Sequence, residues 1–290
     1  MEKLLEKEDY KFSVLMPIYI HEKDDELRLA IDSVINQTLM PNEILIIADK
    51  DIPQNTKTIL EEYKSKYPEI FNPVILTEDA SVGKARAIGV VKAKFDIVAN
   101  MDADDLSRSD RFEKQIQFLK DNPNIDVVGS CITEFENSPE NIYAKRDVPL
   151  LNEDINKYCK FRNPINNMTV MYRKHAVIEA GNYKDMREFE DYELWSRMII
   201  KGYKFANLSD YLINARAGRD MIIRRQGLSV YFKYEYPLFL SFYKQKFITG
   251  KEFLKAIISK YFLRAIPNWL KSIIYYNFLH KKTSEEEVNK

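Results

Sequence analysis

The sequence is poor in the residues that most often hold metals or form disulfides. Two of its 290 residues are cysteines and three are histidines. Cys131 and Cys159 cannot form a disulfide framework or a zinc site built from several thiolates, which favours a reducing compartment. His21, His175 and His280 lack the spacing of metal ligands, so we expect them at the surface or in structural positions.

Net charge and long apolar runs are absent as well. The chain has 44 basic and 44 acidic residues, a balance that argues against a surface built as a whole for nucleic acid. No apolar run reaches the roughly 18 residues needed to span a bilayer, and the mixed-charge stretch 1–11 does not have the form of a signal peptide. We therefore expect a cytoplasmic protein that is not an integral membrane protein.

Short apolar runs alternate with stretches of helical period over the first 130 residues. Strands that alternate with helices in this way predict an α/β fold with a Rossmann-like, mostly parallel sheet flanked by helices. Ligands of such sheets bind beyond the carboxyl ends of the strands. The first expected strand is ended by Pro17, and Asp24 or Asp25 is the expected N-cap of the first helix. Expected strands are 12–19, 43–48, 73–76, 95–101, 126–130 and 170–172; expected helices are 24–35, 55–67, 83–94, 109–121, 174–180 and 191–201.

Two carboxylates follow the expected strand 95–101. Residues i and i+2 of an extended chain point to the same face, so Asp102 and Asp104 can converge on one point. They would repel each other without a cation, and Mg²⁺ or Mn²⁺ held together with substrate phosphates suits such a pair. The same residues are also compatible with an ordinary acidic turn, in which Asp105 or Ser107 begins a helix.

Several motifs in this order resemble the family 2 glycosyltransferases with a GT-A fold, especially bacterial enzymes that build cell-surface polysaccharides. The resemblance extends from Phe12 to about Gly227. Its motifs are SVLMPIY at 13–19, AIDSVINQT at 30–38, EILII at 43–47 before Asp49, Ala85-Arg86 with Gly89, and Asp102-Ala103-Asp104-Asp105.

The resemblance implies a nucleotide-diphosphate sugar donor, a UDP-sugar above all, and a Mg²⁺ or Mn²⁺ ion. Asp102 and Asp104 would hold the metal. The basic pair Arg224-Arg225 could close over the diphosphate, or could be a solvated basic loop. The residues implied in donor binding are Pro17, Tyr19, Asp49, Arg86, Asp102, Arg224 and Arg225.

A second acidic pair, Glu190-Asp191, resembles the family's Glu-Asp segment that opens a helix before a Leu-Trp pair. The resemblance makes Asp191 the general base, with Glu190 binding or positioning the acceptor. Direct displacement would then invert the anomeric centre. Acidic residues at a helix start also simply complement the helix dipole. The loop 162–169 resembles an acceptor-side loop in which many relatives have His at the position of Asn167, or it is an ordinary turn.

The last sixty residues differ in charge from the rest. Residues 231–290 contain 11 basic and 5 acidic side chains, whereas 1–230 contain 33 and 39. We expect a GT-A catalytic domain at 1–230 and a basic, aromatic, helical extension at 231–290. The extension either meets an anionic membrane surface or packs on the catalytic domain or on a second copy in a homodimer.

These features indicate an inverting, metal-dependent transfer of a sugar to a hydroxyl of a saccharide or lipid-linked saccharide in polysaccharide synthesis. Two alternatives stay open. Ile20, Ala48 and Ala87 depart from the family's usual residues and allow a non-catalytic nucleotide-sugar-binding or scaffold protein. A nucleotidyltransferase would show a glycine-rich basic loop after the first strand, and residues 18–25 contain no glycine.

Overall fold

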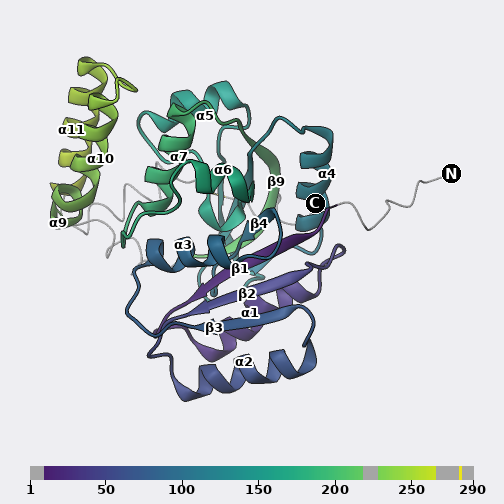
Figure 1. Ribbon diagram of the computed structural model, residues 1–290. Helices are drawn as coiled ribbons and strands as arrows, with labels where there is room; N and C mark the ends of the chain where they lie inside the picture. Colours follow the sequence, from purple (N-terminus) through teal and green to yellow (C-terminus); the bar gives the residue numbers. More distant parts are fainter. Residues whose placement is uncertain (1–9, 218–227, 266–280, 283–290) are drawn as a thin grey trace.

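The computed structural model describes residues 10–217, 228–265 and 281–282. Ten strands of this part form a single sheet, in the order β10-β7-β6-β8-β4-β1-β2-β3, with β9 pairing to β5 and β6 (Figure 1). The strands are β1 Phe12–Ile18, β2 Glu43–Ala48, β3 Phe71–Ile75, β4 Ile97–Asn100, β5 Leu106–Ser107, β6 Val127–Phe135, β7 Ile142–Arg146, β8 Met171–Arg173, β9 Phe205–Arg216 and β10 Lys281–Lys282.

Helices cover both faces of the sheet. The α-helices are α1 Asp24–Ile35, α2 Gln54–Lys66, α3 Val82–Lys92, α4 Arg111–Asp121, α5 Asn152–Cys159, α6 Lys174–Glu179, α7 Glu190–Ile200, α9 Leu228–Val230, α10 Tyr236–Lys244 and α11 Gly250–Ala265. A 3₁₀ turn, η1, spans Asn167–Thr169, and a π-helical stretch, η2, spans Tyr231–Glu235. No helix of the described part is long and apolar enough to cross a membrane.

Successive side chains of the central strands point alternately to the two faces of the sheet, and they form one hydrophobic core on each face. Val14 and Met16 of β1 belong to the core beneath α1, α2 and α4. Leu15, between them, belongs to the core beneath α3, α5, α6 and α7. Both sides of the central strands are therefore buried, which is why these strands are almost uniformly apolar.

The strands β3, β2, β1 and β4 are mutually parallel, and β8 joins β4 antiparallel. β6 is antiparallel to β8 and parallel to β9, so β1, β4, β6 and β9 all run in one direction. Their carboxyl ends consequently meet at one edge of the sheet, where ligands of α/β sheets bind.

Two local expectations at the first strand and helix were wrong. β1 continues through Pro17 to Ile18. The backbone groups of Leu15 point toward β4, since its carbonyl accepts from the N–H of Met101. The backbone nitrogen of Pro17, two residues later, points to the same side. β4 ends at Asn100, opposite Leu15, so the missing N–H of Pro17 leaves no ladder bond unmade. The N-cap of α1 is Lys23, and Asp24 and Asp25 lie in its first turn.

The C-terminal helices pack on the second core. The rings of Phe239 and Phe242 in α10 lie 6.3 and 5.6 Å from the ring of Tyr192 in α7. The division proposed at residue 230 falls within a continuous helical stretch, 228–244. Residues 266–280 and 283–290 of the expected helical extension lie outside the described residues.

Candidate active site

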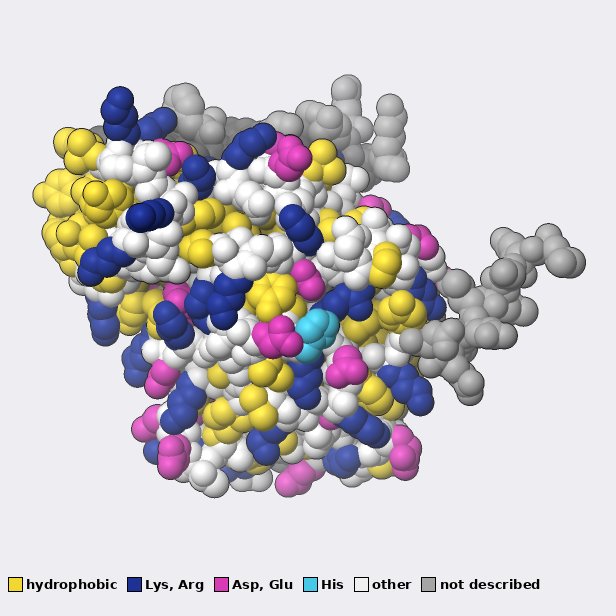
Figure 2. Space-filling view, turned by 45° about the horizontal axis from the view of Figure 1, so that its top comes forward, with side chains coloured by type: hydrophobic (Ala, Val, Ile, Leu, Met, Phe, Trp, Pro, Cys, Tyr) yellow, Lys and Arg dark blue, Asp and Glu magenta, His cyan; other side chains and the backbone are white. Residues whose placement is uncertain are grey.

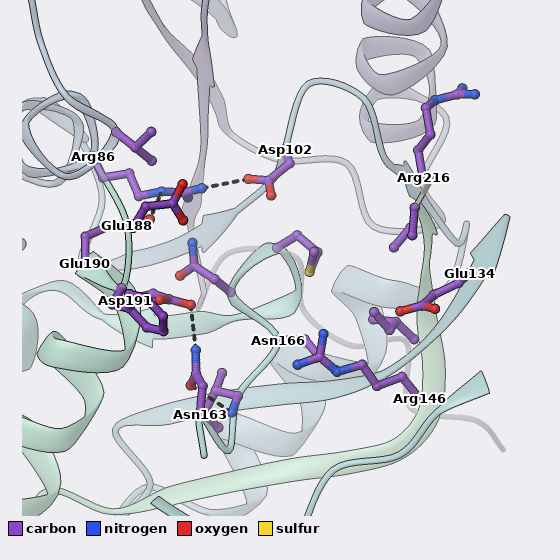
Figure 3. Close-up of a pocket in the computed structure, with 18 of the residues that line it drawn as sticks. Arg86, Asp102, Glu134, Arg146, Asn163, Asn166, Glu188, Glu190, Asp191 and Arg216 are labelled. Carbon is purple, nitrogen blue, oxygen red and sulfur yellow. Dashed lines mark hydrogen bonds and ion pairs between the residues drawn. The ribbon is translucent and has the colours of Figure 1, made fainter. Parts of the chain in front are cut away.

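A pocket of about 380 Å³ lies at the carboxyl edge of the sheet (Figure 3). Its walls come from the turn after β4, from the ends of β6 and β9, from the loop before η1 and from the start of α7. Four residues singled out in the sequence line it together: Arg86, Asp102, Glu190 and Asp191. The sheet topology therefore gathers in one cavity Asp102 of the first acidic pair and both members of the second pair, almost ninety residues later, whereas Asp104 does not line the pocket.

Arg86 is placed by the close packing of α3 against the loop that leads to α7. The Ser81 hydroxyl accepts from the N–H of Lys84 and caps α3. The N–H of Gly83 donates to the carbonyl of Met186 at 3.0 Å. A Cβ on Gly83 would overlap the carbonyl oxygen of Lys184, so a larger residue would push the two segments apart. This contact holds Arg86 beside the first turn of α7.

The Arg86 guanidinium is almost fully buried and links the two acidic pairs. Its Nη2 donates to Asp102 Oδ1 at 2.8 Å, and its Nε lies 3.8 Å from Glu190 Oε1. With its amide oxygen turned toward the guanidinium, Asn167 accepts from Nη1 at 2.9 Å. Burial is the largest single influence on Arg86 and lowers its pKa, but the combined electrostatic effects of Asp102, Tyr183, Tyr19 and Glu190 outweigh it. The pKa is therefore raised, and Arg86 stays protonated.

Asp191 lies in the first turn of α7, and two neighbouring groups donate hydrogen bonds to its carboxylate. Its Oδ2 accepts from Asn163 Nδ2 and its Oδ1 from the N–H of Tyr192, both at 2.7 Å. Phe189, the N-cap, has φ of 63°, a left-handed conformation that costs a residue other than glycine about 1–3 kcal/mol. Backbone strain is thus stored directly before Glu190 and Asp191.

The sequence model described as Glycosyl transferase family 2 matches residues 13–181, more than half of the chain. The chain belongs to glycosyl transferase family 2. The family and the GT-A type of α/β fold expected from the sequence are therefore confirmed, and the protein is a glycosyltransferase.

Named glycosyltransferases match nearly the whole chain. The amylovoran biosynthesis glycosyltransferase AmsE of Erwinia amylovora is 34% identical over 275 residues, which cover 93% of this chain and 98% of that protein. The UDP-Gal:alpha-D-GlcNAc-diphosphoundecaprenol beta-1,3-galactosyltransferase of Escherichia coli is 29% identical over 271 residues, 93% and 97% of the two chains. The solved mannosyltransferase PcManGT of Pyrobaculum calidifontis, in complex with GDP-Man and Mn²⁺, has a TM-score of 0.63 at 14% identity and covers 91% of this chain and 73% of its own.

Pro17, Tyr19 and Asp49, which were also expected to bind the donor, do not line the pocket. Pro17 and Tyr19 are at the carboxyl end of β1, and Asp49 follows β2. The Tyr19 hydroxyl is buried and has no hydrogen-bond partner in the described part of the chain. Asp49 Oδ1 accepts from the N–H of Lys50. Arg224 and Arg225 lie outside the described residues.

Glu22, in the loop after β1, is a third carboxylate near the Asp102–Asp104 pair, and no sequence motif indicated it. Burial, then the charges of Asp104 and Asp102, raise the pKa of Glu22 to about 8. Burial and the charge of Asp102 raise the pKa of Asp104 to about 6. The glycosyltransferase therefore gathers three carboxyl groups at the carboxyl ends of β1 and β4.

The pair Asp102 and Asp104 fits a divalent cation whose remaining ligands a donor would supply. Carboxylate oxygens are the ligands that Mg²⁺ and Mn²⁺ prefer. After burial, the charges of neighbouring carboxylates also contribute to the raised pKa values of Glu22 and Asp104. Within the described residues, no group of three or more acidic, histidine or cysteine side chains is placed to hold a metal by itself. Phosphate oxygens would have to supply the remaining ligands.

The sequence pattern did not predict β9, whose last residue, Arg216, is hydrogen-bonded to the acidic turn 102–105. The N–H of Arg216 donates to Asp105 Oδ1 at 2.8 Å, and its Nε donates to the carbonyl of Asp104 at 3.2 Å. The guanidinium stacks on the Phe135 ring at 4.6 Å. β6 and β7 add Glu134 and Arg146 to the pocket lining. The alternation of Tyr211, Ile213 and Ala215 was the local signal for this strand.

Replacing Glu22 by glutamine should stabilise the metal-free protein at high pH. Because the pKa of Glu22 is about 8 when folded and 4.5 ordinarily, the folded state binds more protons between these values, and stability falls as the pH rises through this window. We expect the free energy of unfolding of Glu22→Gln to match that of the wild type near pH 5 and to exceed it near pH 8 by about 2–4 kcal/mol, solvent screening included.

Denaturant unfolding at the two pH values measures the difference. Glu61→Gln, at an exposed position of α2, is the control and should follow the wild type; equal stability of Glu22→Gln and wild type near pH 8 would contradict the prediction.

Proposed function

We propose that this family 2 enzyme is an inverting, metal-dependent glycosyltransferase that uses a nucleotide-diphosphate sugar, a UDP-sugar above all. The acceptor is a hydroxyl of a saccharide or lipid-linked saccharide in the synthesis of a cell-surface polysaccharide. One observation carries the proposal: a single pocket holds Asp102, from the acidic turn after β4, and Asp191, from the start of α7. Asp102 belongs to the side of the leaving group and Asp191 to the side of the attacking hydroxyl.

Asp191 is assigned as the general base. Its carboxylate lines the pocket, and Asn163 and the N–H of Tyr192 orient it from behind. A carboxylate so held can take the proton of the acceptor hydroxyl as that oxygen attacks the anomeric carbon. The bond from the anomeric carbon to the donor phosphate breaks in the same step, so the configuration at that carbon inverts.

Asp102 and Asp104 are assigned to the metal. A divalent cation held there would supply Lewis-acid charge to the departing diphosphate. Arg86 is already engaged by Asp102 and Glu190 in the structure, and we therefore assign it to positioning these two carboxylates. Glu190 is then left to orient the acceptor beside Asp191.

The relatives support the choice of substrates. The E. coli galactosyltransferase, named for UDP-Gal and a diphosphoundecaprenol-linked acceptor, aligns over 93% of this chain. PcManGT, in complex with a nucleotide-diphosphate sugar and Mn²⁺, shares the fold. The departures at Ile20, Ala48 and Ala87 bear on the contacts with the donor base.

Removal of divalent metal should strongly reduce turnover. The test incubates the purified protein with a panel of nucleotide-diphosphate sugars and measures release of nucleoside diphosphate with Mn²⁺, with Mg²⁺ and with EDTA. We expect turnover with at least one donor and a loss of about 10²-fold or more in EDTA, because the charge on the leaving diphosphate is then unscreened. Full activity in EDTA would contradict metal dependence. Metal-stimulated donor binding without turnover, with or without saccharide acceptors, would instead favour the non-catalytic binding protein.

A further inference from the structure

The helix α11 packs Phe253, Ala256 and Ile257 against the second core but exposes other large apolar side chains on its outer face. Leu254, Ile258, Tyr261 and Phe262 are spaced i, i+4, i+7 and i+8 and so form one stripe. Their exposed fractions are 55%, 46%, 42% and 64%. A helix on the surface of a water-soluble domain normally presents its polar side to solvent, so this stripe needs a partner.

On the opposite, inner face of α11, two basic side chains form ion pairs with a buried glutamate. Lys260 Nζ lies 3.2 Å from Glu235 Oε1, and Arg264 Nε lies 2.8 Å from Glu235 Oε2. Glu235 is only 1% exposed. Rotating α11 to hide its apolar stripe would break this buried ion cluster, which is costly because it leaves an uncompensated charge. The cluster therefore fixes the apolar stripe outward.

Aromatic residues of η2 widen the stripe into a patch. Phe232, 59% exposed, lies 6.5 Å ring to ring from Tyr261. Tyr231 contacts both rings, at 5.0 and 6.0 Å. Figure 2 shows hydrophobic side chains gathered at the upper left of the molecule, with Lys and Arg side chains around them.

The exposed charges of the α10–α11 hairpin, residues 231–265, are positive. Both acidic residues of the hairpin are engaged: Glu235 in the buried cluster, and Glu252 with Lys160 at 3.1 Å. The solvent-exposed lysines of this segment are Lys233, Lys244, Lys246, Lys251 and Lys255. An anionic lipid surface complements such charge, whereas a second copy of the hairpin would repel it.

We propose that the outer face of the α10–α11 hairpin docks on an anionic lipid bilayer, with Phe232, Ile258, Tyr261 and Phe262 entering the interface and the lysines meeting the headgroups. The arrangement matches the composition of interfacial helices, which combine basic residues with large apolar ones. Arg264, on the inner face of the same helix, lines the catalytic pocket. Docking would thus place the pocket close to the membrane surface. The use of this placement for a lipid-linked acceptor rests on the proposed function, whereas the docking itself does not.

Vesicle flotation of the full chain tests the proposal. We expect binding to phosphatidylcholine–phosphatidylglycerol vesicles that weakens at high salt, and weak binding to phosphatidylcholine alone. The double variant Ile258→Glu/Phe262→Glu should bind the anionic vesicles about tenfold or more weakly. Lys251→Glu/Lys255→Glu should lose most of the preference for anionic lipid. Leu151→Glu changes an apolar side chain that is 69% exposed and does not belong to the hairpin; it is the matched control and should bind like the wild type.

Two results would overturn the docking surface: no vesicle binding by the wild type, or unchanged binding by Ile258→Glu/Phe262→Glu. If the wild type does not bind vesicles but forms a dimer in sedimentation, and this variant is a monomer, the apolar face is an interface between two copies of the chain. Nucleoside diphosphate release from the donor is measured on the same samples and should be equal in wild type and variant. Vesicle binding without any donor turnover would therefore count against the proposed function while supporting the docking surface.

Discussion

Asp191→Asn is expected to lower kcat for sugar transfer by about 10²–10⁴-fold, the usual contribution of a positioned general base. Asparagine keeps the size of the side chain and can still accept from Asn163, but it cannot take the proton of the acceptor hydroxyl. Donor affinity should stay close to the wild-type value, because Asp191 is not among the residues assigned to the metal. Steady-state transfer kinetics together with donor titration by calorimetry separate the two quantities.

The control for this variant removes an equivalent charge elsewhere. Asp154 stands in the first turn of α5 as Asp191 does in α7, so Asp154→Asn reproduces the effect on a helix dipole without touching the pocket. It should leave kcat unchanged. Asn163→Ala, which removes the donor to Asp191 Oδ2, should reduce kcat by about tenfold and spare donor binding. Wild-type transfer by Asp191→Asn would show that another group takes the proton.

Asp102→Asn is expected to lower kcat/KM by about 10³-fold or more and to remove the stimulation of donor binding by Mn²⁺ or Mg²⁺. A neutral amide in place of the carboxylate weakens the metal site and the charge stabilisation of the leaving diphosphate. The readouts are transfer rates over a range of metal concentrations and donor binding with and without metal. Retention of metal-stimulated binding would contradict the assignment of Asp102.

Stability should change little in this variant, since two effects oppose each other. Buried Arg86 loses an ion pair at 2.8 Å but keeps Glu190 and Asn167. Asp104 and Glu22 meanwhile lose a repelling neighbour. We expect an unfolding free energy within about 1–2 kcal/mol of the wild type in metal-free buffer. Asp110→Asn, at the N-cap of α4 and outside the pocket, is the matched control for activity.

Elements with a strong local pattern were predicted from the sequence. The strands β1 to β4 and the helices α1 to α4 lie within a few residues of their expected positions, because each combines an apolar run or a helical period with a turn signal at its ends. The family motifs fall on these elements. They predicted the residues that the structure then brings into one pocket, Arg86, Asp102, Glu190 and Asp191, while the roles of these residues stay predictions.

Elements that depend on distant partners were missed. β9 is interrupted by polar residues, and it forms because it pairs with β6, roughly eighty residues earlier. β7 and α5 likewise escaped the sequence pattern. Such pairings depend on long-range contacts that a local period does not contain.

The sequence by itself determined the family, the α/β class and the two acidic pairs, since all of these are local patterns of residue type and spacing. Only the tertiary structure decided that Glu22 joins the acidic turn, that Arg86 lies buried between Asp102 and Glu190, and that α11 turns its apolar stripe outward. The reason is physical. Which charges meet, and which side of a helix is covered, depends on segments that are far apart in the chain and come together only when it folds.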